Sequence, residues 1–298
     1  KRGGLRVLTP FANKETMESP QIYRGTIDAI ANHLQSIKQS MSEYVILTGS
    51  RVLYSMDYRD MLRQHQETGA DITVVYADNL NGTNRIPQGS PIIQLNEENR
   101  IGRVRIVEEE QANVRGNWCV GACAIRRTLL ESLVADAISH QRYDVYRDIL
   151  QRLTPALKIF GYRYSGHILE ISTISGYMEA NKAMLNPEFS DKIFKKTVYT
   201  KVKDSVPARY GADCYVENSI ISDGCQIRGT VINSIVSRGV QIDKGAVVKD
   251  SIVMQDTEIM DLATVEHAIL DKDVIVRDGR EVIGHPAYPI VLPKMSIV

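Results

Sequence analysis

The stretch Ser234-Ile235-Val236 recurs 17 residues later as Ser251-Ile252-Val253, and after 17 more as Ala268-Ile269-Leu270. An earlier copy, Ser219-Ile220-Ile221, precedes the first by 15 residues. Short apolar pairs that return at such a period between turns of Gly, Asp and Asn indicate stacked coils, because each coil buries its inner face against the next. The sequence therefore predicts a left-handed parallel β-helix of hexapeptide repeats over residues 208–298, with about four or five coils.

The same period aligns Ile235, Ile252 and Ile269 in one column. We expect this column to face the inside of the β-helix, with each side chain nearly fully buried, because stacked apolar side chains hold the coils together. A β-sandwich does not fit, since its strands do not keep so fixed a period.

One histidine, His267, lies within the repeats. Hexapeptide β-helices occur in acyltransferases that use a catalytic histidine between subunits, so this class of enzyme is one alternative. A lone histidine on a coil more often faces solvent, and an acyltransferase leaves the residues ahead of the repeats unexplained. The solvent-facing interpretation is preferred.

Ahead of the repeats, apolar runs typical of strands alternate with segments of helical spacing. A helix is predicted over residues 27–39, and Val45-Ile46-Leu47 is a short apolar run that closes on Gly49, as in a strand buried on both faces of a parallel sheet. The alternation predicts a mainly parallel sheet covered by helices, in a Rossmann-like α/β domain over residues 1–185. The polar segment 186–207 is interpreted as an irregular linker with an entry strand.

Three places in this half are candidates for a binding site. Ligands of open α/β sheets bind beyond the carboxyl ends of the strands, and Ser50 follows the glycine that ends the apolar run, although an ordinary turn also favours serine. Arg24, Gly25 and Thr26 precede the predicted helix, where free N–H groups favour a phosphate. Gly121 inside a predicted strand indicates the close approach of another backbone or a ligand.

Charge and hydropathy exclude several classes of partner. The 36 basic and 36 acidic residues cancel, so there is no net field to attract nucleic acid or an anionic membrane surface. No apolar run approaches the ~18 residues of a membrane span, and no signal peptide is visible. The length of 298 residues favours two domains. The opening Lys1-Arg2-Gly3-Gly4-Leu5 is typical of the inside of a domain, so we expect the true amino terminus to be missing.

The cysteines argue against a zinc site, because none of them forms a paired CxxC motif. We expect buried, reduced thiols and a cytoplasmic protein. The four are Cys119, Cys123, Cys214 and Cys225.

The segment Tyr23-Arg24-Gly25-Thr26-Ile27-Asp28-Ala29-Ile30, in an α/β domain ahead of a β-helix, resembles the bacterial glucose-1-phosphate adenylyltransferase family. That family makes ADP-glucose from ATP and glucose 1-phosphate for glycogen synthesis, and this segment matches its YRGT-x-DA motif almost fully. Further segments resemble the family at residues 43–58, 144–148, 175–185 and 199–210. The resemblance implies a nucleotidyltransferase domain, with the family's phosphate-cradling Gly-rich loop upstream of residue 1.

The departures from the family pattern concern its chemistry. The family holds Mg²⁺ with two aspartates, and the resemblance places Ser50 at the first position and Glu170 at the second. The family's sugar-binding Glu-Lys pair falls near Glu108 and Glu109, so an acidic residue stands where a lysine is expected. Mg²⁺ requires near-octahedral oxygen ligands, and we therefore expect no metal site. The nucleotide candidates stay Arg24, Gly25 and Thr26, and the sugar candidates are Glu108 and Gly121.

Three interpretations follow. The first is a regulatory subunit with little or no catalytic activity, which resembles the degenerate paralogue that some bacteria pair with a catalytic subunit. The second is an active adenylyltransferase with altered metal ligands, and the third is a related sugar nucleotidyltransferase or a scaffold. The first implies the catalytic glucose-1-phosphate adenylyltransferase subunit as partner, a hetero- or homo-oligomer such as a tetramer, and a nucleotide or sugar phosphate as a possible ligand.

Overall fold

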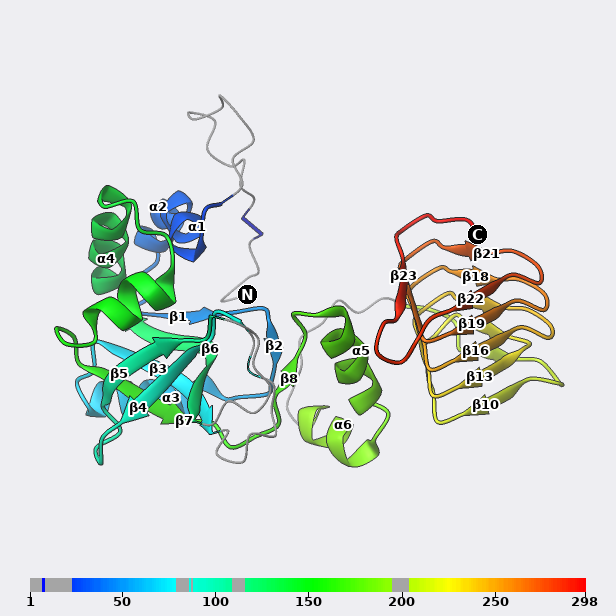
Figure 1. Cartoon of the computed structure of the whole chain (residues 1–298), viewed down its shortest axis with the longest axis horizontal. Helices are drawn as coiled ribbons and strands as arrows, with labels where there is room; N and C mark the ends of the chain where they lie inside the picture. Colours follow the sequence, from blue (N-terminus) through cyan, green and yellow to red (C-terminus); the bar gives the residue numbers. More distant parts are fainter. Residues whose placement is uncertain (1–6, 9–22, 79–85, 87, 109–115, 195–203) are drawn as a thin grey trace, which may run out of the picture. The chain divides into compact units, whose positions relative to one another are not determined.

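A computed structural model describes residues 7–8, 23–78, 86, 88–108, 116–194 and 204–298 (Figure 1). Its contacts divide the chain into two compact units. The first comprises residues 1–52 and 56–167, and the second comprises residues 53–55 and 168–298. Each unit is described by itself.

The first unit is built on a six-stranded sheet with the order β5-β4-β6-β3-β7, in which β1 also pairs with β6. Only β3 and β7 pair in parallel, whereas the other four pairings between described strands are antiparallel. The strands are β1 (Tyr44–Thr48), β3 (Ile72–Asp78), β4 (Pro91–Leu95), β5 (Ile101–Ile106), β6 (Asn117–Arg126) and β7 (Ile159–Arg163).

The predicted mainly parallel sheet is therefore wrong for the described strands. The turn at residues 96–99 joins β4 directly to β5, without the crossover helix that parallel neighbours need. The interpretation of β1 as a strand buried on both faces is also wrong. Its first four residues are only half-buried, and its one partner among the described strands is β6.

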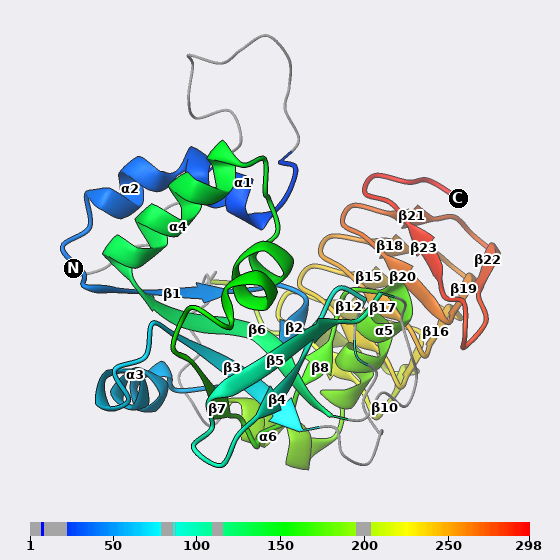
Figure 2. The same ribbon diagram turned by 60° about the vertical axis from the view of Figure 1, so that its left-hand side comes forward.

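Helices lie on both sides of this sheet. Figure 2 shows α1 (Thr26–Asn32), α2 (Leu34–Lys38) and α4 (Arg127–Ser139) on one side and α3 (Tyr58–Glu67) on the other. A π-helical turn, η2 (Val145–Gln151), packs beside α4. The helix predicted over 27–39 is divided at His33, whose ring nitrogen is hydrogen-bonded to the Tyr23 hydroxyl at 2.9 Å. The core includes Ile27, Val74, Leu130, Val134 and Ile159.

The predicted β-helix is confirmed in the second unit. Three five-stranded parallel sheets have the orders β10-β13-β16-β19-β22, β11-β14-β17-β20-β23 and β21-β18-β15-β12-β9. Their strands are β9 (Arg209–Tyr210), β10 (Tyr215–Glu217), β11 (Ile220–Ile221), β12 (Gln226–Ile227), β13 (Thr230–Ile232), β14 (Ile235–Val236), β15 (Gln241–Ile242), β16 (Val247–Lys249), β17 (Ile252–Val253), β18 (Glu258–Ile259), β19 (Thr264–Glu266), β20 (Ala268–Leu270), β21 (Ile275–Val276), β22 (Glu281–Ile283) and β23 (Ile290–Leu292).

The column of isoleucines exists but does not face inward. Ile235 pairs with Ile252 and Ile252 with Ile269 across neighbouring strands, as the period predicts. The interior is filled by the residue after each of them, and Val236, Val253 and Leu270 are all 0% exposed. Successive side chains of a strand point to opposite faces, so the isoleucines lie on the outside, where Ile235 is only half-buried.

Helix α5 (Ile174–Ala183) buries the middle of this outer column. Its Met178 packs on Ile252 and Ile269, which are 3% and 5% exposed. The Lys182 ammonium lies 2.6 Å from a carboxylate oxygen of Asp250, which fixes the carboxyl half of the helix to the coils. The sequence predicts that Ile252 and Ile269 are buried inside the β-helix. They are buried on its outside instead, under α5.

The second unit also contains β8 (Leu169–Glu170), which pairs with β2 (Val52–Leu53), and α6 (Pro187–Phe194). Helix α6 lies within the predicted irregular linker, so that interpretation is wrong for residues 187–194. Proline suits the first helical position, and the Asn186 side chain accepts a hydrogen bond from the Glu188 N–H at 3.0 Å. The contacts also group residues 168–185 with the β-helix, earlier than the predicted domain limit at residue 185.

Candidate functional site

A cavity of about 540 Å³ lies where β1 ends. It is bounded by the loop after β1, by the middle of β6 and by the start of η2. Of the residues singled out from the sequence, Thr26, Ser50 and Gly121 line it. It lies beyond the carboxyl end of a strand, which is where α/β sheets bind ligands.

The space arises at a fork along β6, which is the place where this strand changes its partner from β4 to β1. The start of β6 pairs with β4 and its end pairs with β1, on the same edge of the strand. Between them, the Gly49 N–H donates to the Gly121 carbonyl at 2.6 Å. Gly121 has φ +89°, a conformation that favours glycine, and a Cβ there would lie 3.8 Å from the Gly49 Cα. The close approach of another backbone predicted at Gly121 is therefore seen.

Ser50 and the residue after it, Arg51, are both exposed on the cavity wall. The Arg51 guanidinium donates through Nη2 to the Gln88 carbonyl at 2.6 Å. The Gln88 side chain in turn donates to the Glu108 carbonyl at 2.7 Å. Glu108 is thus connected to Arg51 through its backbone, but it is not among the residues that line the cavity. Glu109 lies outside the described residues.

Arg24 and Gly25 have a different role from the one expected. The Arg24 guanidinium donates to both carboxylate oxygens of Asp28 at 3.1 Å and to the Tyr143 hydroxyl at 2.6 Å. The hydrogen bond from Arg24 lowers the pKa of Asp28 below its usual value. The Ile27 N–H donates to the Tyr143 carbonyl at 2.9 Å, and a Cβ on Gly25 would lie 2.4 Å from that oxygen.

These contacts attach the start of α1 to the segment ahead of η2. The Arg24 charge has a carboxylate partner, and the Ile27 N–H donates to the Tyr143 carbonyl. Of the three nucleotide candidates, the structure brings only Thr26 to the cavity.

Tyr146 of η2 also lines the cavity, and inspection of the sequence did not single it out. Its hydroxyl would lie 3.6 Å from a Cβ on Gly121. Burial raises the pKa of Tyr146 well above its usual range, so the hydroxyl keeps its proton at neutral pH. Burial likewise raises the pKa of Cys123, another lining residue, to about 12. The only sequence signal for this element was the aspartate spacing at residues 144–148.

The carboxylates of Asp144 and Glu170 both accept hydrogen bonds from nearby residues of the chain. Asp144 lines the cavity, and its carboxylate accepts hydrogen bonds at 2.8 Å from the N–H groups of Tyr146 and Arg147. The Glu170 carboxylate accepts from the Ser172 N–H at 2.7 Å and from the Ser172 hydroxyl. Glu170 belongs to the second unit, whereas Ser50 belongs to the first.

The residues that line the cavity do not fit Mg²⁺. Mg²⁺ in nucleotide sites is held by carboxylate oxygens, but Ser50 is neutral, Arg51 is cationic and Asp144 caps the η2 turn. A permanently charged guanidinium beside the site disfavours a divalent cation by direct repulsion.

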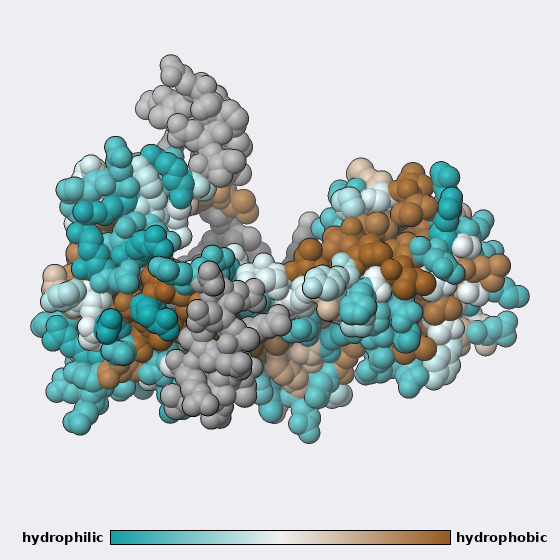
Figure 3. All heavy atoms as spheres, in the orientation of Figure 1, coloured by the Kyte–Doolittle hydropathy of each residue, from teal (hydrophilic) through white to brown (hydrophobic). Residues whose placement is uncertain are grey.

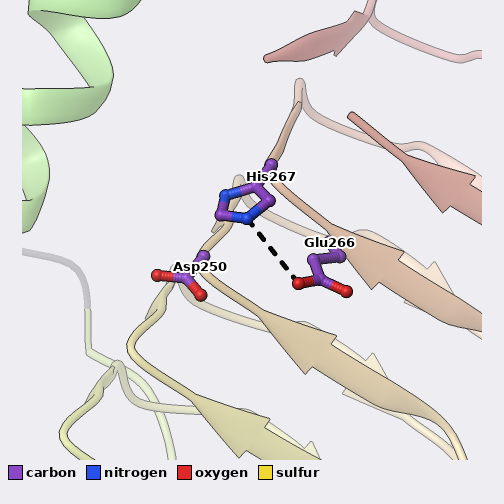
Figure 4. Close-up of side chains that lie close together, drawn as sticks. All are labelled: Asp250, Glu266 and His267. Atoms are coloured by element: carbon purple, nitrogen blue, oxygen red, sulfur yellow. Dashed lines mark ion pairs between the residues drawn. The ribbon is translucent and has the colours of Figure 1, made fainter. Parts of the chain in front are cut away.

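A second group of candidate metal ligands, Asp250, Glu266 and His267, lies on the β-helix, with ligand atoms within 4.8 Å of one another (Figure 4). Both carboxylates have ammonium partners, Lys182 at 2.6 Å from Asp250 and Lys249 at 3.2 Å from Glu266. His267 Nε2 lies 3.6 Å from a Glu266 oxygen, and its side chain is 18% exposed. The interpretation of His267 as a solvent-facing residue is therefore wrong, because its ring turns along the coil edge toward these carboxylates.

Family models match both units. The model described as nucleotidyl transferase matches residues 8–84, and that described as GlmU-like, C-terminal hexapeptide matches residues 203–287. The chain therefore belongs to the class of nucleotidyltransferase domains that carry a hexapeptide β-helix.

Curated relatives narrow this class. The glucose-1-phosphate adenylyltransferase of Fervidobacterium nodosum is 28% identical over 96% of this chain and 68% of its own length. The glycogen biosynthesis protein GlgD of Bacillus subtilis is 28% identical over 91% of this chain and 68% of its own length. The Bacillus cereus glucose-1-phosphate adenylyltransferase is 29% identical, with 93% and 73% covered. The chain is therefore similar to glucose-1-phosphate adenylyltransferases and to GlgD over most of its length, and it spans about two thirds of the length of these relatives.

Two further observations concern location. In the part of the chain that the structure describes, every helix is too short or too polar to cross a membrane. All four cysteines are free thiols, and Cys119 and Cys225 are buried.

Proposed function

We propose that this chain is a regulatory subunit of glucose-1-phosphate adenylyltransferase, with weak or no catalytic activity of its own. The observation that supports it is the pair Ser50 and Arg51 at the cavity where β1 ends. A hydroxyl and a guanidinium occupy the place where the resemblance to the family expects a metal-binding carboxylate.

The proposed loss of activity follows from the chemistry of nucleotidyl transfer. A sugar phosphate that attacks ATP needs its negative charge and that of the triphosphate to be neutralised, and Mg²⁺ does this in most such enzymes. Loss of the metal removes several kcal/mol of transition-state stabilisation. Each ~1.4 kcal/mol corresponds to a factor of ten in rate, so we expect turnover at least about a hundredfold below that of a catalytic subunit.

The proposed partner is the catalytic glucose-1-phosphate adenylyltransferase subunit, in a hetero-oligomer such as a tetramer. Figure 3 shows apolar side chains gathered over the carboxyl-terminal coils of the β-helix. Near the carboxyl end of the chain, Val291, Ile297 and Tyr288 are 43%, 59% and 81% exposed, and exposed apolar surface supports subunit contact. Any effect on the partner must come from contacts that favour its active arrangement, and a typical coupling changes affinity by roughly 5- to 150-fold.

The experiment is to co-express the full-length protein with the catalytic subunit, purify the complex and compare its kinetics with those of the catalytic subunit alone. We expect a stable complex in which the affinity for substrate or activator is changed. The proposal is contradicted if no complex forms, or if the complex has the same affinity for substrate and activator as the catalytic subunit alone. Robust turnover by the isolated full-length protein would instead favour an active adenylyltransferase with altered ligands.

A further inference from the structure

Arg51 is the one cationic residue, and Asp144 the one acidic residue, among the described residues that line the cavity. The two side chains differ in the partners that they already have among the described residues. The Asp144 carboxylate accepts two backbone N–H groups at the start of η2, each at 2.8 Å. One of its two oxygens, Oδ1, therefore faces donors of its own turn.

Arg51 has no such counter-charge within the described residues. Its one hydrogen bond there is to the neutral carbonyl of Gln88, at 2.6 Å from Nη2. Two other arginines of the same unit do have such a partner, since Arg24 pairs with Asp28 and Arg127 with Glu131. A guanidinium carries five N–H donors, so the bond to Gln88 leaves most of them for another acceptor.

The Gln88 bond also fixes the position of Arg51. Gln88 is itself held through its side-chain amide, which donates to the Glu108 carbonyl at 2.7 Å. Gly89, the next residue, lines the cavity, and its φ of +79° and missing side chain leave the space beside Arg51 Nη1 open. The guanidinium is therefore held at the cavity wall before any ligand arrives, which lowers the entropic cost of binding.

Neutral donors accompany this charge. Ser50 precedes Arg51 on the same loop, and Tyr146 presents a hydroxyl near Gly121. A tyrosine hydroxyl is protonated at neutral pH, and burial raises the pKa of Tyr146 further, so the hydroxyl is able to donate. Leu47, Val74 and Leu150 supply an apolar part of the wall. A cavity of about 540 Å³ that is mostly apolar with a few polar groups is typical of a small-molecule site.

We propose that this cavity binds a phosphate monoester without Mg²⁺, and that the Arg51 guanidinium supplies the positive charge in place of the metal. The planar fork of an arginine matches two phosphate oxygens, and it needs neither a carboxylate pair nor an octahedral shell. The ligand class is the phosphate group shared by sugar phosphates and nucleotides. This inference rests on the proposed function, because a chain that performs catalysis would need the metal at this place.

The test is equilibrium binding to the full-length protein, with glucose 1-phosphate, ATP and inorganic phosphate as separate probes. Each titration is run once with MgCl₂ and once with EDTA. We expect at least one probe to bind with a dissociation constant that EDTA changes by less than about twofold. Loss of a charge-assisted hydrogen bond should make Arg51→Gln bind about ten- to a hundredfold more weakly. Arg51→Lys, which keeps the charge but not the fork, should be intermediate.

Arg103→Gln is the matched control, because this arginine is exposed on β5 and does not line the cavity. It should bind like the parent, and all variants should show the parent's melting temperature. Comparison of the three probes identifies whether the sugar phosphate or the nucleotide is the preferred source of the phosphate.

The inference is overturned if none of the probes binds, if binding requires Mg²⁺, or if Arg51→Gln binds as the parent does. Those results leave the proposed regulatory role standing as long as the isolated protein forms no ADP-glucose. Formation of ADP-glucose by the isolated protein at the rate of a catalytic subunit would instead contradict the proposed function itself.

Discussion

Met178 of α5 and Ile252 of β17 pack against each other on the outer face of the β-helix, and both side chains are buried. Val253, the next residue of the same strand, faces the interior and is 0% exposed. Neighbouring residues of one two-residue strand are thus buried by different partners. One is buried by the coils, and the other is buried by a helix that the coils support.

This difference gives a prediction for stability. Val253→Asp places a carboxylate among apolar side chains that cannot move away, and we expect it to cost about 3–5 kcal/mol or to prevent folding of the β-helix. Ile252→Asp should cost less, because α5 is able to lift away and expose the charge. Chemical denaturation measures both free energies of unfolding, and limited proteolysis within residues 168–194 reports release of α5. Equal stability of Ile252→Asp and the parent would contradict the packing described here.

A glycine substitution tests the fork in β6. Gly121→Ala forces a side chain into φ +89°, with the Gly49 Cα at 3.8 Å, and should lower the free energy of unfolding by about 1–3 kcal/mol. Gly102→Ala is the control, since Gly102 lies in β5 with nothing within 4 Å of an added Cβ. The control should leave the denaturation midpoint unchanged or raise it. A harmless Gly121→Ala would contradict the positive φ described for this residue.

The buried thiol of Cys119 predicts a pH dependence. Burial raises the pKa of Cys119 well above its usual value of 9.0. Above pH 9 the unfolded chain releases this proton while the folded chain keeps it, so the contribution to stability is present below pH 9 and is lost as pH rises. One thiol changes the free energy of unfolding by about 1.4 kcal/mol per pH unit in that range. Cys119→Ala should flatten the decline measured by denaturation between about pH 9 and 10.5, and an identical slope in both proteins would refute this.

The β-helix could be predicted from the sequence because each coil contacts only its neighbours. The fold therefore appears in the sequence as a local period of 17 residues. It did not predict which member of the Ile252 and Val253 pair faces inward, because both are apolar and α5 buries the outer one. The sheet of the first unit was mistaken for a parallel one, since strand pairing depends on contacts that a strand and helix pattern does not contain.

The candidate site was predicted in part. Ser50, Thr26 and Gly121 were singled out separately, from the end of a strand, a helix start and a glycine in a strand, and all three line one cavity. The contact of Arg24 with Tyr143 could not be predicted from the sequence, because the two residues lie 119 positions apart. Arg51 and Tyr146 lie inside segments that resemble the family but were not singled out, because only the structure shows that both line the cavity.

Restoring one carboxylate should not restore catalysis. Ser50→Asp places the new carboxylate directly beside Arg51, whose guanidinium lines the same cavity and offsets its charge. The resemblance to the family also leaves Glu109 where a lysine is expected. We expect ADP-glucose formation by Ser50→Asp to stay within about threefold of the parent. A catalytic subunit assayed in parallel is the positive control, and recovery to within about tenfold of its rate would contradict this account.

The most direct test of the central claim is the rate of ADP-glucose formation by the isolated full-length protein, freed of any catalytic subunit, with ATP, glucose 1-phosphate and Mg²⁺ at saturation. The account predicts a rate at least about a hundredfold below that of the catalytic subunit, because Ser50 and Arg51 line the cavity where the resemblance to the family expects a metal-binding carboxylate. A Mg²⁺-dependent rate comparable to that of the catalytic subunit would contradict it.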